Sequence, residues 1–178
     1  MSGTAKLVPM SVKAGVSAEE YLHTSYPDLD REYRDGRIVE RGPADYLHSR
    51  AHASVGVFFE ALRKKFSFYT CLELRLKLRA GLYLIPDVCV FQNPPPLGDG
   101  LVPDTPPFVV IEIFSRTDRM NDVEEKLSTF KNWGVTHVWL VNPYSKRMFV
   151  YEQGLVETPA LPIPEFGLQL TPDDAFDA

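Results

Sequence analysis

The chain has 178 residues, 44% of them hydrophobic, and a formal net charge of −5 at pH 7. This length is enough to bury one substantial core and is short for two domains. The acidic balance argues against a protein that coats nucleic acid through general positive charge, although it allows a local basic groove. No segment approaches the roughly 18 apolar residues of a membrane span, and the N-terminus lacks the apolar centre of a signal peptide. We therefore expect a cytoplasmic protein that does not insert into a membrane.

The N-terminal part of the chain predicts an arm, a short helix and a hairpin. Residues 1–15 are expected to form a flexible N-terminal arm, and residues 16–178 a single domain. Ser17 is expected to begin a helix, because Glu20 follows at the spacing of a capping box. The pair Asp35-Gly36 separates two short segments, 31–34 and 37–40, and Asp-Gly favours the type I′ turn of a hairpin.

A long helix and two strands are predicted next. Apolar residues recur at helical spacing between residues 45 and 66. Residues 69–79 alternate between apolar and charged side chains, as in a strand with one buried face, and a tight turn leads into an apolar strand over residues 82–91. We expect these two strands to pair antiparallel. Each contains one cysteine, Cys71 or Cys89, and we expect both to be free, buried thiols in a reducing compartment.

The second half of the chain predicts a loop, a helix and three strands. Residues 93–107 contain six prolines and predict the loop. After a strand around Glu112, a helix is expected over residues 121–133, with Asn121 and Glu124 as its capping box and Gly134 as its C-terminal stop. Residues 137–142 and 147–153 predict two more strands. This order predicts an α+β domain in which two long helices flank a mixed sheet of about five or six strands.

Glu112 is a carboxylate inside the apolar run 108–114. Such a run, rich in β-branched and aromatic residues, predicts a strand buried on both faces. Burying an ionised carboxylate without a partner is very costly, so a metal ion, a cation or a raised pKa must offset that cost. The strand before the proline-rich loop has a matching acid, Asp87, in equally apolar surroundings. Two oxygen ligands on two core strands match the preference of Mg²⁺ or Mn²⁺.

Lys126 is the third candidate, because it falls on the apolar stripe of the predicted helix when residues are placed at about 100° intervals. A lysine on that stripe faces the protein. For a lone lysine, a surface pair with Asp122 or a side chain that extends past Trp133 to solvent is the alternative. We expect Lys126 to face the acids instead, because the Glu112 strand runs directly into this helix.

The chain resembles the PD-(D/E)XK nuclease superfamily, which has a restriction-endonuclease-like fold. The resemblance lies in the order of three features: Pro86-Asp87, then Glu112 in an apolar strand, then a lysine. The usual pattern has its lysine two residues after the acid, where this chain has Phe114. In this chain the lysine lies on the predicted helix that follows. In this position it resembles the lysine of one branch of the superfamily, the Uma-type putative restriction endonucleases. The resemblance to that branch covers nearly the whole chain: the hairpin 32–40, His48 at the helix start, residues 85–88, the strand 110–115, the segment 122–127 and the strand 137–143.

The resemblance implies a catalytic constellation. Asp87, Glu112 and the main-chain carbonyl of Ile113 would hold Mg²⁺ or Mn²⁺ beside a scissile phosphate. Lys126 would orient the attacking water or neutralise charge in the transition state. A second dipeptide, Pro103-Asp104, lies in the proline-rich loop without an apolar strand around it, so we prefer Asp87 as the metal ligand.

Three further residues are candidates for an accessory role in this site. Glu32 and Glu40 of the hairpin could reach a second metal or position the first, and a solvated carboxylate is the equal alternative for each. His48 could take part in the site or be an ordinary residue of the helix start. His48 and His52, spaced i and i+4, could bind zinc, but the sequence offers no third ligand.

We therefore predict a Mg²⁺-dependent endonuclease that hydrolyses DNA. A homodimer is the natural assembly, because a single domain of this size contacts little DNA. The strand face with Arg75, Lys77 and Arg79 could contact DNA phosphates or could simply be solvated. The alternative function is a nuclease fold that binds DNA or protein with weak or no catalysis, although the retained acid–acid–lysine set argues against it.

Overall fold

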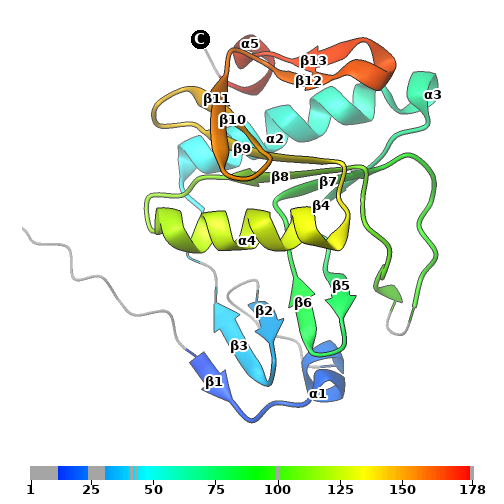
Figure 1. Ribbon diagram of the computed structural model, residues 1–178, viewed down its shortest axis with the longest axis vertical. Helices are drawn as coiled ribbons and strands as arrows, with labels where there is room; N and C mark the ends of the chain where they lie inside the picture. The colour runs from blue at the N-terminus through cyan, green and yellow to red at the C-terminus, as the bar shows by residue number, and fades with distance from the viewer. Residues whose placement is uncertain (1–11, 24–30, 41, 43, 99–100, 177–178) are drawn as a thin grey trace, which may run out of the picture.

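The main layer of the protein is a six-stranded mixed sheet with one long helix on each face. The computed structural model describes residues 12–23, 31–40, 42, 44–98 and 101–176. Helix α2 (Tyr46–Ala61) and helix α4 (Met120–Trp133) lie on opposite sides of this sheet (Figure 1). The sheet order is β11-β10-β9-β8-β7-β4, and among the described pairs only β8 and β9 run parallel. The strands are β4 (Tyr69–Leu72), β7 (Val88–Phe91), β8 (Val109–Ile113), β9 (His137–Asn142), β10 (Arg147–Tyr151) and β11 (Leu155–Thr158).

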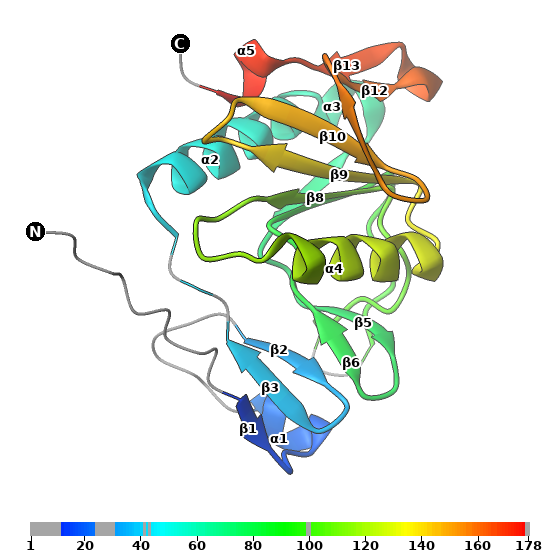
Figure 2. The same ribbon diagram turned by 60° about the vertical axis from the view of Figure 1, so that its left-hand side comes forward.

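A second sheet lies below the first in both views (Figure 2). Its order is β1-β3-β2-β6-β5, and the ring of Tyr21 in helix α1 (Ala18–His23) stacks on Tyr33 in its core. The predicted hairpin is confirmed, with φ of 47° at Asp35 and 84° at Gly36, which a type I′ turn requires. The strands are β1 (Val12–Ala14), β2 (Arg31–Arg34), β3 (Arg37–Glu40), β5 (Leu76–Arg79) and β6 (Leu82–Leu84).

The N-terminal elements agree with the sequence prediction in part. Ser17 does begin helix α1, because its hydroxyl accepts the amide of Glu20 at 3.0 Å. The end of the predicted flexible arm is strand β1, which pairs with β3. Residues 1–11 of that arm lie outside the described residues.

The two strands predicted over residues 69–79 and 82–91 are each broken in two. Glu73 has a φ of 51°, so the chain turns after β4 and joins the second sheet as β5. On the return path Pro86 separates β6 from β7, because proline has no amide hydrogen for the strand ladder and fixes φ. The antiparallel pairing is as predicted, but it occurs as two pairs, β5 with β6 and β4 with β7. Asp87 therefore lies where the chain passes from one sheet to the other.

Helix α4 and the C-terminal segment differ from the prediction in detail. The helix begins at Met120 after Arg119, so the predicted capping box of Asn121 and Glu124 is wrong, whereas Gly134 ends it with a φ of 110° as predicted. The C-terminal segment, for which the sequence predicted no elements, packs on the α2 side of the sheet. It contains β12 (Leu161–Ile163), a 3₁₀ turn (Pro164–Phe166), β13 (Leu168–Leu170) and α5 (Pro172–Ala175), and a short helix α3 (Arg63–Phe66) follows α2.

The side chains of β8 alternate between two apolar cores. Ile111 packs on the α2 side with Phe59 and Trp139, whereas Val110 packs on the α4 side with Leu127. Each such side chain contributes about 1.5–3 kcal/mol when fully buried, so both faces of this strand are strongly fixed. In the part of the chain that the structure describes, no helix is long and apolar enough to cross a bilayer.

Candidate active site

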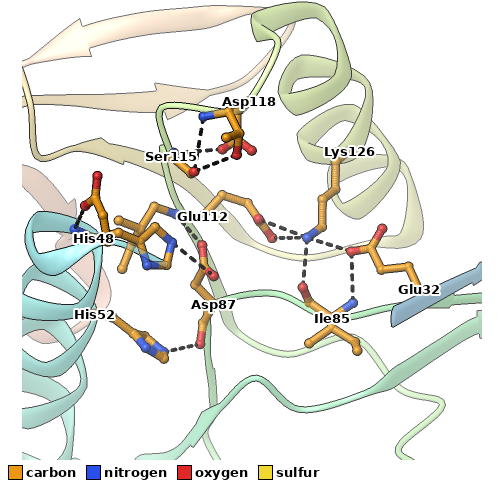
Figure 3. Close-up of polar contacts among 12 residues, drawn as sticks. Glu32, His48, His52, Ile85, Asp87, Glu112, Ser115, Asp118 and Lys126 are labelled. Atoms are coloured by element: carbon orange, nitrogen blue, oxygen red, sulfur yellow. Dashed lines mark hydrogen bonds and ion pairs between the residues drawn. The ribbon is translucent and has the colours of Figure 1, made fainter. Parts of the chain in front are cut away.

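Asp87 is fully buried at the junction of the two sheets. Its Oδ2 accepts the amide of Ile113 at 2.6 Å, and its Oδ1 lies 3.6 Å from Nε2 of His48 (Figure 3). Its main-chain carbonyl contacts Nε2 of His52 at 2.8 Å and accepts the amide of Glu73 at 3.0 Å. Both the carboxylate and the backbone of Asp87 are thus fixed, and the carboxylate meets β8 beside Glu112.

Lys126 faces Glu112, as the sequence predicted. Glu112 shares the α4 side of β8 with Val110, two residues earlier, because side chains alternate along a strand. The Lys126 ammonium lies 2.9 Å from each carboxylate oxygen of Glu112. Both residues are 7% exposed, and Asp122, the alternative partner, is exposed on the helix surface. A loop held by the Ser115 amide donating to Asp118 at 2.8 Å turns the chain back so that α4 crosses β8.

Glu32 reaches the same lysine from the second sheet. Its Oε1 lies 2.7 Å from the Lys126 ammonium and accepts the amide of Ile85 at 3.3 Å. The Ile85 carbonyl accepts a further hydrogen bond from Lys126 at 2.8 Å. An ammonium has three hydrogens, and here their partners are Glu112, Glu32 and Ile85 (Figure 3). Arg34 adds a second cation at 2.9 Å from Glu32.

The buried polar side chains of the described residues all gather at this junction: Glu32, His48, Asp87, Glu112 and Lys126. Burial of charged groups is rare in proteins unless they are paired or bind a metal. Here three buried carboxylates accompany one buried ammonium, which contacts Glu32 and Glu112, and Arg34 and His48 lie at the edges. The site therefore has an excess of negative charge over its buried cation, which favours an additional cation.

The donor set fits a hard divalent cation such as Mg²⁺. The amide of Ile113 points to Asp87, and the carbonyl of the same residue in an extended strand points to the same side. The carboxylates of Asp87 and Glu112 and the main-chain carbonyl of Ile113 are the groups at the end of β8 that could hold such an ion. No three His, Cys, Asp or Glu side chains form a metal-ligand group among the described residues. Mg²⁺ is compatible with such a sparse set, because it keeps several waters and takes only one or two carboxylates.

Comparisons with known proteins decide the family. The model of the Uma2 family, described as "Putative restriction endonuclease", matches residues 18–177. The chain belongs to this family. A solved structure described as a "putative nuclease" from Anabaena variabilis superposes with a TM-score of 0.76 over 90% of this chain and 97% of that chain, at 22% identity. No curated protein matches the chain. The fold is restriction-endonuclease-like, and family and fold support a nuclease function in general terms.

Two residues contact Asp87 or His48 in the structure although the sequence did not predict these contacts. His52 lies one helical turn after His48 and contacts the Asp87 carbonyl, so both histidines face Asp87. Asp45 caps α2 by accepting the amide of His48 at 3.1 Å, and it accepts the hydroxyl of Tyr144 at 2.8 Å. The i, i+4 spacing of the histidines was the available sequence signal. The acidic cap could have been found from the helix start, but not its contact with Tyr144.

The predicted accessory acids and the predicted DNA-contact residues have different partners in the structure. Glu40 forms an ion pair with Arg31 at 2.8 Å, away from Lys126, so of the two hairpin acids Glu32 belongs to the site. The predicted DNA-contact residues Arg75, Lys77 and Arg79 all follow the break at Glu73, and their contact with DNA stays a prediction. Arg75 lies over the ring of Tyr21 at 4.4 Å, Arg79 forms a bidentate pair with Asp35 at 2.7 and 2.8 Å, and Lys77 is on β5 between them.

Proposed function

We propose that the protein is a metal-dependent endonuclease that hydrolyses phosphodiester bonds in DNA. The observation that carries the proposal is the buried set of Asp87, Glu112 and Lys126 at the end of β8, in a fold shared with nucleases. Buried charges of this kind are costly to keep and are concentrated at functional sites. A purely structural junction between two sheets would be satisfied by apolar side chains.

Mg²⁺ or Mn²⁺ would be held by Asp87, Glu112 and the main-chain carbonyl of Ile113. When bound, such an ion polarises the scissile phosphate and lowers the pKa of the attacking water. Asp87 is prepared for this role because the Ile113 amide and His48 fix the direction of its carboxylate. Glu112 is prepared because its neighbours on the strand are anchored in both apolar cores.

Lys126 would contact the phosphate or the attacking water. In the structure its three partners are Glu112, Glu32 and the Ile85 carbonyl. If Glu112 shares its charge with a cation, one N–H of the ammonium becomes available to a phosphate oxygen. Glu32 and Ile85 still hold the ammonium in place, so Glu32 would act as a positioning residue for Lys126. A cation fixed in a water-poor site stabilises developing negative charge more strongly than one in bulk water.

The test is nicking of supercoiled plasmid by the purified full chain. We expect cleavage with Mg²⁺ or Mn²⁺, loss of cleavage with EDTA, and loss in Glu112→Gln. Glu157→Gln, an exposed acid on β11, is the matched control and should retain activity. Mn²⁺ binding, followed by calorimetry, should weaken in Glu112→Gln and stay unchanged in Glu157→Gln.

Two results would contradict the proposal. Cleavage that is equal in wild type and Glu112→Gln would identify a contaminating nuclease. DNA binding that needs no metal and persists in Glu112→Gln, without any cleavage, would favour the alternative of a nuclease-fold binding module.

We also propose that the active form is a homodimer, because one domain of this size offers little surface to DNA. Sedimentation velocity of the purified chain should then give a species of twice the mass of 20.2 kDa. A monomer that cleaves DNA at the same specific activity at all protein concentrations would exclude the dimer.

A further inference from the structure

The two cysteines of the chain form a directly opposed pair. Cys71 is in β4 and Cys89 is in β7, and the antiparallel register of these strands places each opposite the other. Opposed side chains lie on the same face of a sheet, and both cysteines pack into the core on the α4 side. The sequence contains no other cysteine, so the pair is isolated from competing thiols.

The two thiols differ in exposure, and the partly exposed one has a lowered pKa. Cys71 is partly exposed, whereas Cys89 is fully buried. A hydrogen bond from Cys89 lowers the pKa of Cys71 from 9.0 to about 7, against the opposing effects of burial and of Glu60. Cys71 is therefore the reactive, accessible thiol, and Cys89 is the thiol held against it.

The strand geometry permits a bond between the two sulfurs. Opposed residues in antiparallel strands have Cβ atoms about 4.5–5.5 Å apart, and disulfides need about 3.5–4.5 Å. The approach required is on the order of 1 Å. Strand β4 is the last strand in the sheet order, so it can move toward β7 without breaking a second ladder.

We propose that Cys71 and Cys89 form a redox-active dithiol that a hydroperoxide converts reversibly to an intramolecular disulfide. The Cys71 thiolate attacks one oxygen of the peroxide, the O–O bond breaks, and Cys71 becomes a sulfenic acid while the other oxygen leaves as water or alcohol. The Cys89 sulfur then attacks the Cys71 sulfur, the S–O bond breaks, and the hydroxyl leaves as water with the proton of Cys89. Two thiols lose two electrons and two protons to the peroxide, and an external dithiol reverses the change.

A backbone hydrogen bond lies close to the pair and holds the two strands together there. Cys71 is two residues before Glu73 and Cys89 is two residues after Asp87, and the amide of Glu73 donates to the carbonyl of Asp87 at 3.0 Å. Resolution of the sulfenic acid is favoured by proximity, because the second thiol is already in contact and need not be brought from solution.

The test treats the reduced full chain with hydrogen peroxide, blocks remaining thiols with N-ethylmaleimide, and measures the intact mass. We expect wild type to lose the mass of two hydrogens, to take up no maleimide, and to regain both thiols with dithiothreitol. Peptide mapping should place the link between Cys71 and Cys89 of one chain. Cys89→Ser should instead accumulate a sulfenic acid at Cys71 that dimedone traps, and Cys71→Ser should resist oxidation while folded.

The opposite results would overturn the proposal. In one, wild-type Cys71 takes up oxygen while Cys89 stays reduced. In another, both thiols remain unmodified under conditions that oxidise the urea-unfolded chain. A disulfide that forms only between two chains would also exclude the intramolecular pair. Because wild type carries the decisive measurement, loss of folding in a cysteine variant does not affect the test.

Discussion

Asp87 and Asp104 both follow a proline, but the structure gives them opposite environments. Asp87 is fully buried between two sheets, and its carboxylate contacts the Ile113 amide and His48. Asp104 is exposed in the proline-rich loop, where the neighbouring Pro103 carbonyl accepts the amide of Lys77 at 2.9 Å. The dipeptide is the same, and the difference comes from what surrounds it. The same contrast between the sheet junction and the outer surface recurs for lysine and glutamate, and it can be tested pair by pair.

The largest effect is expected from the aspartates themselves. Asp87→Asn should lower plasmid nicking by on the order of 10²-fold or more, because an amide is a poor ligand for a divalent cation. Asp104→Asn should leave nicking unchanged. The melting temperature of Asp87→Asn should stay equal to that of wild type or rise, since one of three buried carboxylates loses its charge. Equal activity in the two variants would remove Asp87 from the site.

The two lysines of α4 should differ in stability. Lys126→Met leaves Glu112 and Glu32 buried without their ammonium, and we expect a loss of about 3–5 kcal/mol in the free energy of unfolding. Lys131→Met removes a surface pair with Glu152, which is worth at most about 1 kcal/mol. Urea unfolding measures both. Equal losses would mean that the junction tolerates unpaired carboxylates.

A double variant sharpens the lysine comparison. Glu112→Gln combined with Lys126→Met should recover part of the stability lost in Lys126→Met, because the buried charge and its partner leave together. A double-mutant cycle measures this coupling. Strict additivity of the two single losses would show that the 2.9 Å contact contributes nothing.

The two hairpin glutamates should differ in activity by a smaller factor. Glu32→Gln should lower kcat by about ten-fold with little change in Mn²⁺ affinity, because it positions Lys126 and is not proposed to hold the metal. Glu40→Gln loses only a partly exposed pair with Arg31 and should be near wild type. Weakened Mn²⁺ binding in Glu32→Gln would instead make Glu32 a metal ligand.

The smallest effect concerns the helix cap beside the site. The amide of His48, and then the hydroxyl of Tyr144, hold the pKa of Asp45 below its ordinary 3.8. A lowered folded pKa contributes stability above the unfolded value, and this is lost as pH falls through the folded value. The melting temperature of wild type should therefore exceed that of Asp45→Asn at neutral pH, and the difference should shrink below pH 3.8. A difference that is constant with pH would contradict this.

The local prediction was good where a single segment contained all the information. The Asp35-Gly36 turn, the Glu112 strand and the Gly134 helix end needed only backbone preferences or apolar patterns, and all three are confirmed. Lys126 was placed correctly because the helical period and a buried acid nearby agreed. The capping box at Asn121 was wrong because the loop after β8 ends two residues earlier, so that Arg119 is the N-cap.

What the sequence by itself determined is which residues had to be buried and which elements carry them. Apolar runs around Asp87 and Glu112 oblige these acids to enter the core, and this follows from hydrophobic burial alone. Only the tertiary structure decided that one predicted strand pair divides between two sheets, that Glu32 and not Glu40 meets Lys126, and that Cys71 lies opposite Cys89. These outcomes depend on strand register and on contacts between segments distant in sequence. Local propensity and periodicity contain no information about either.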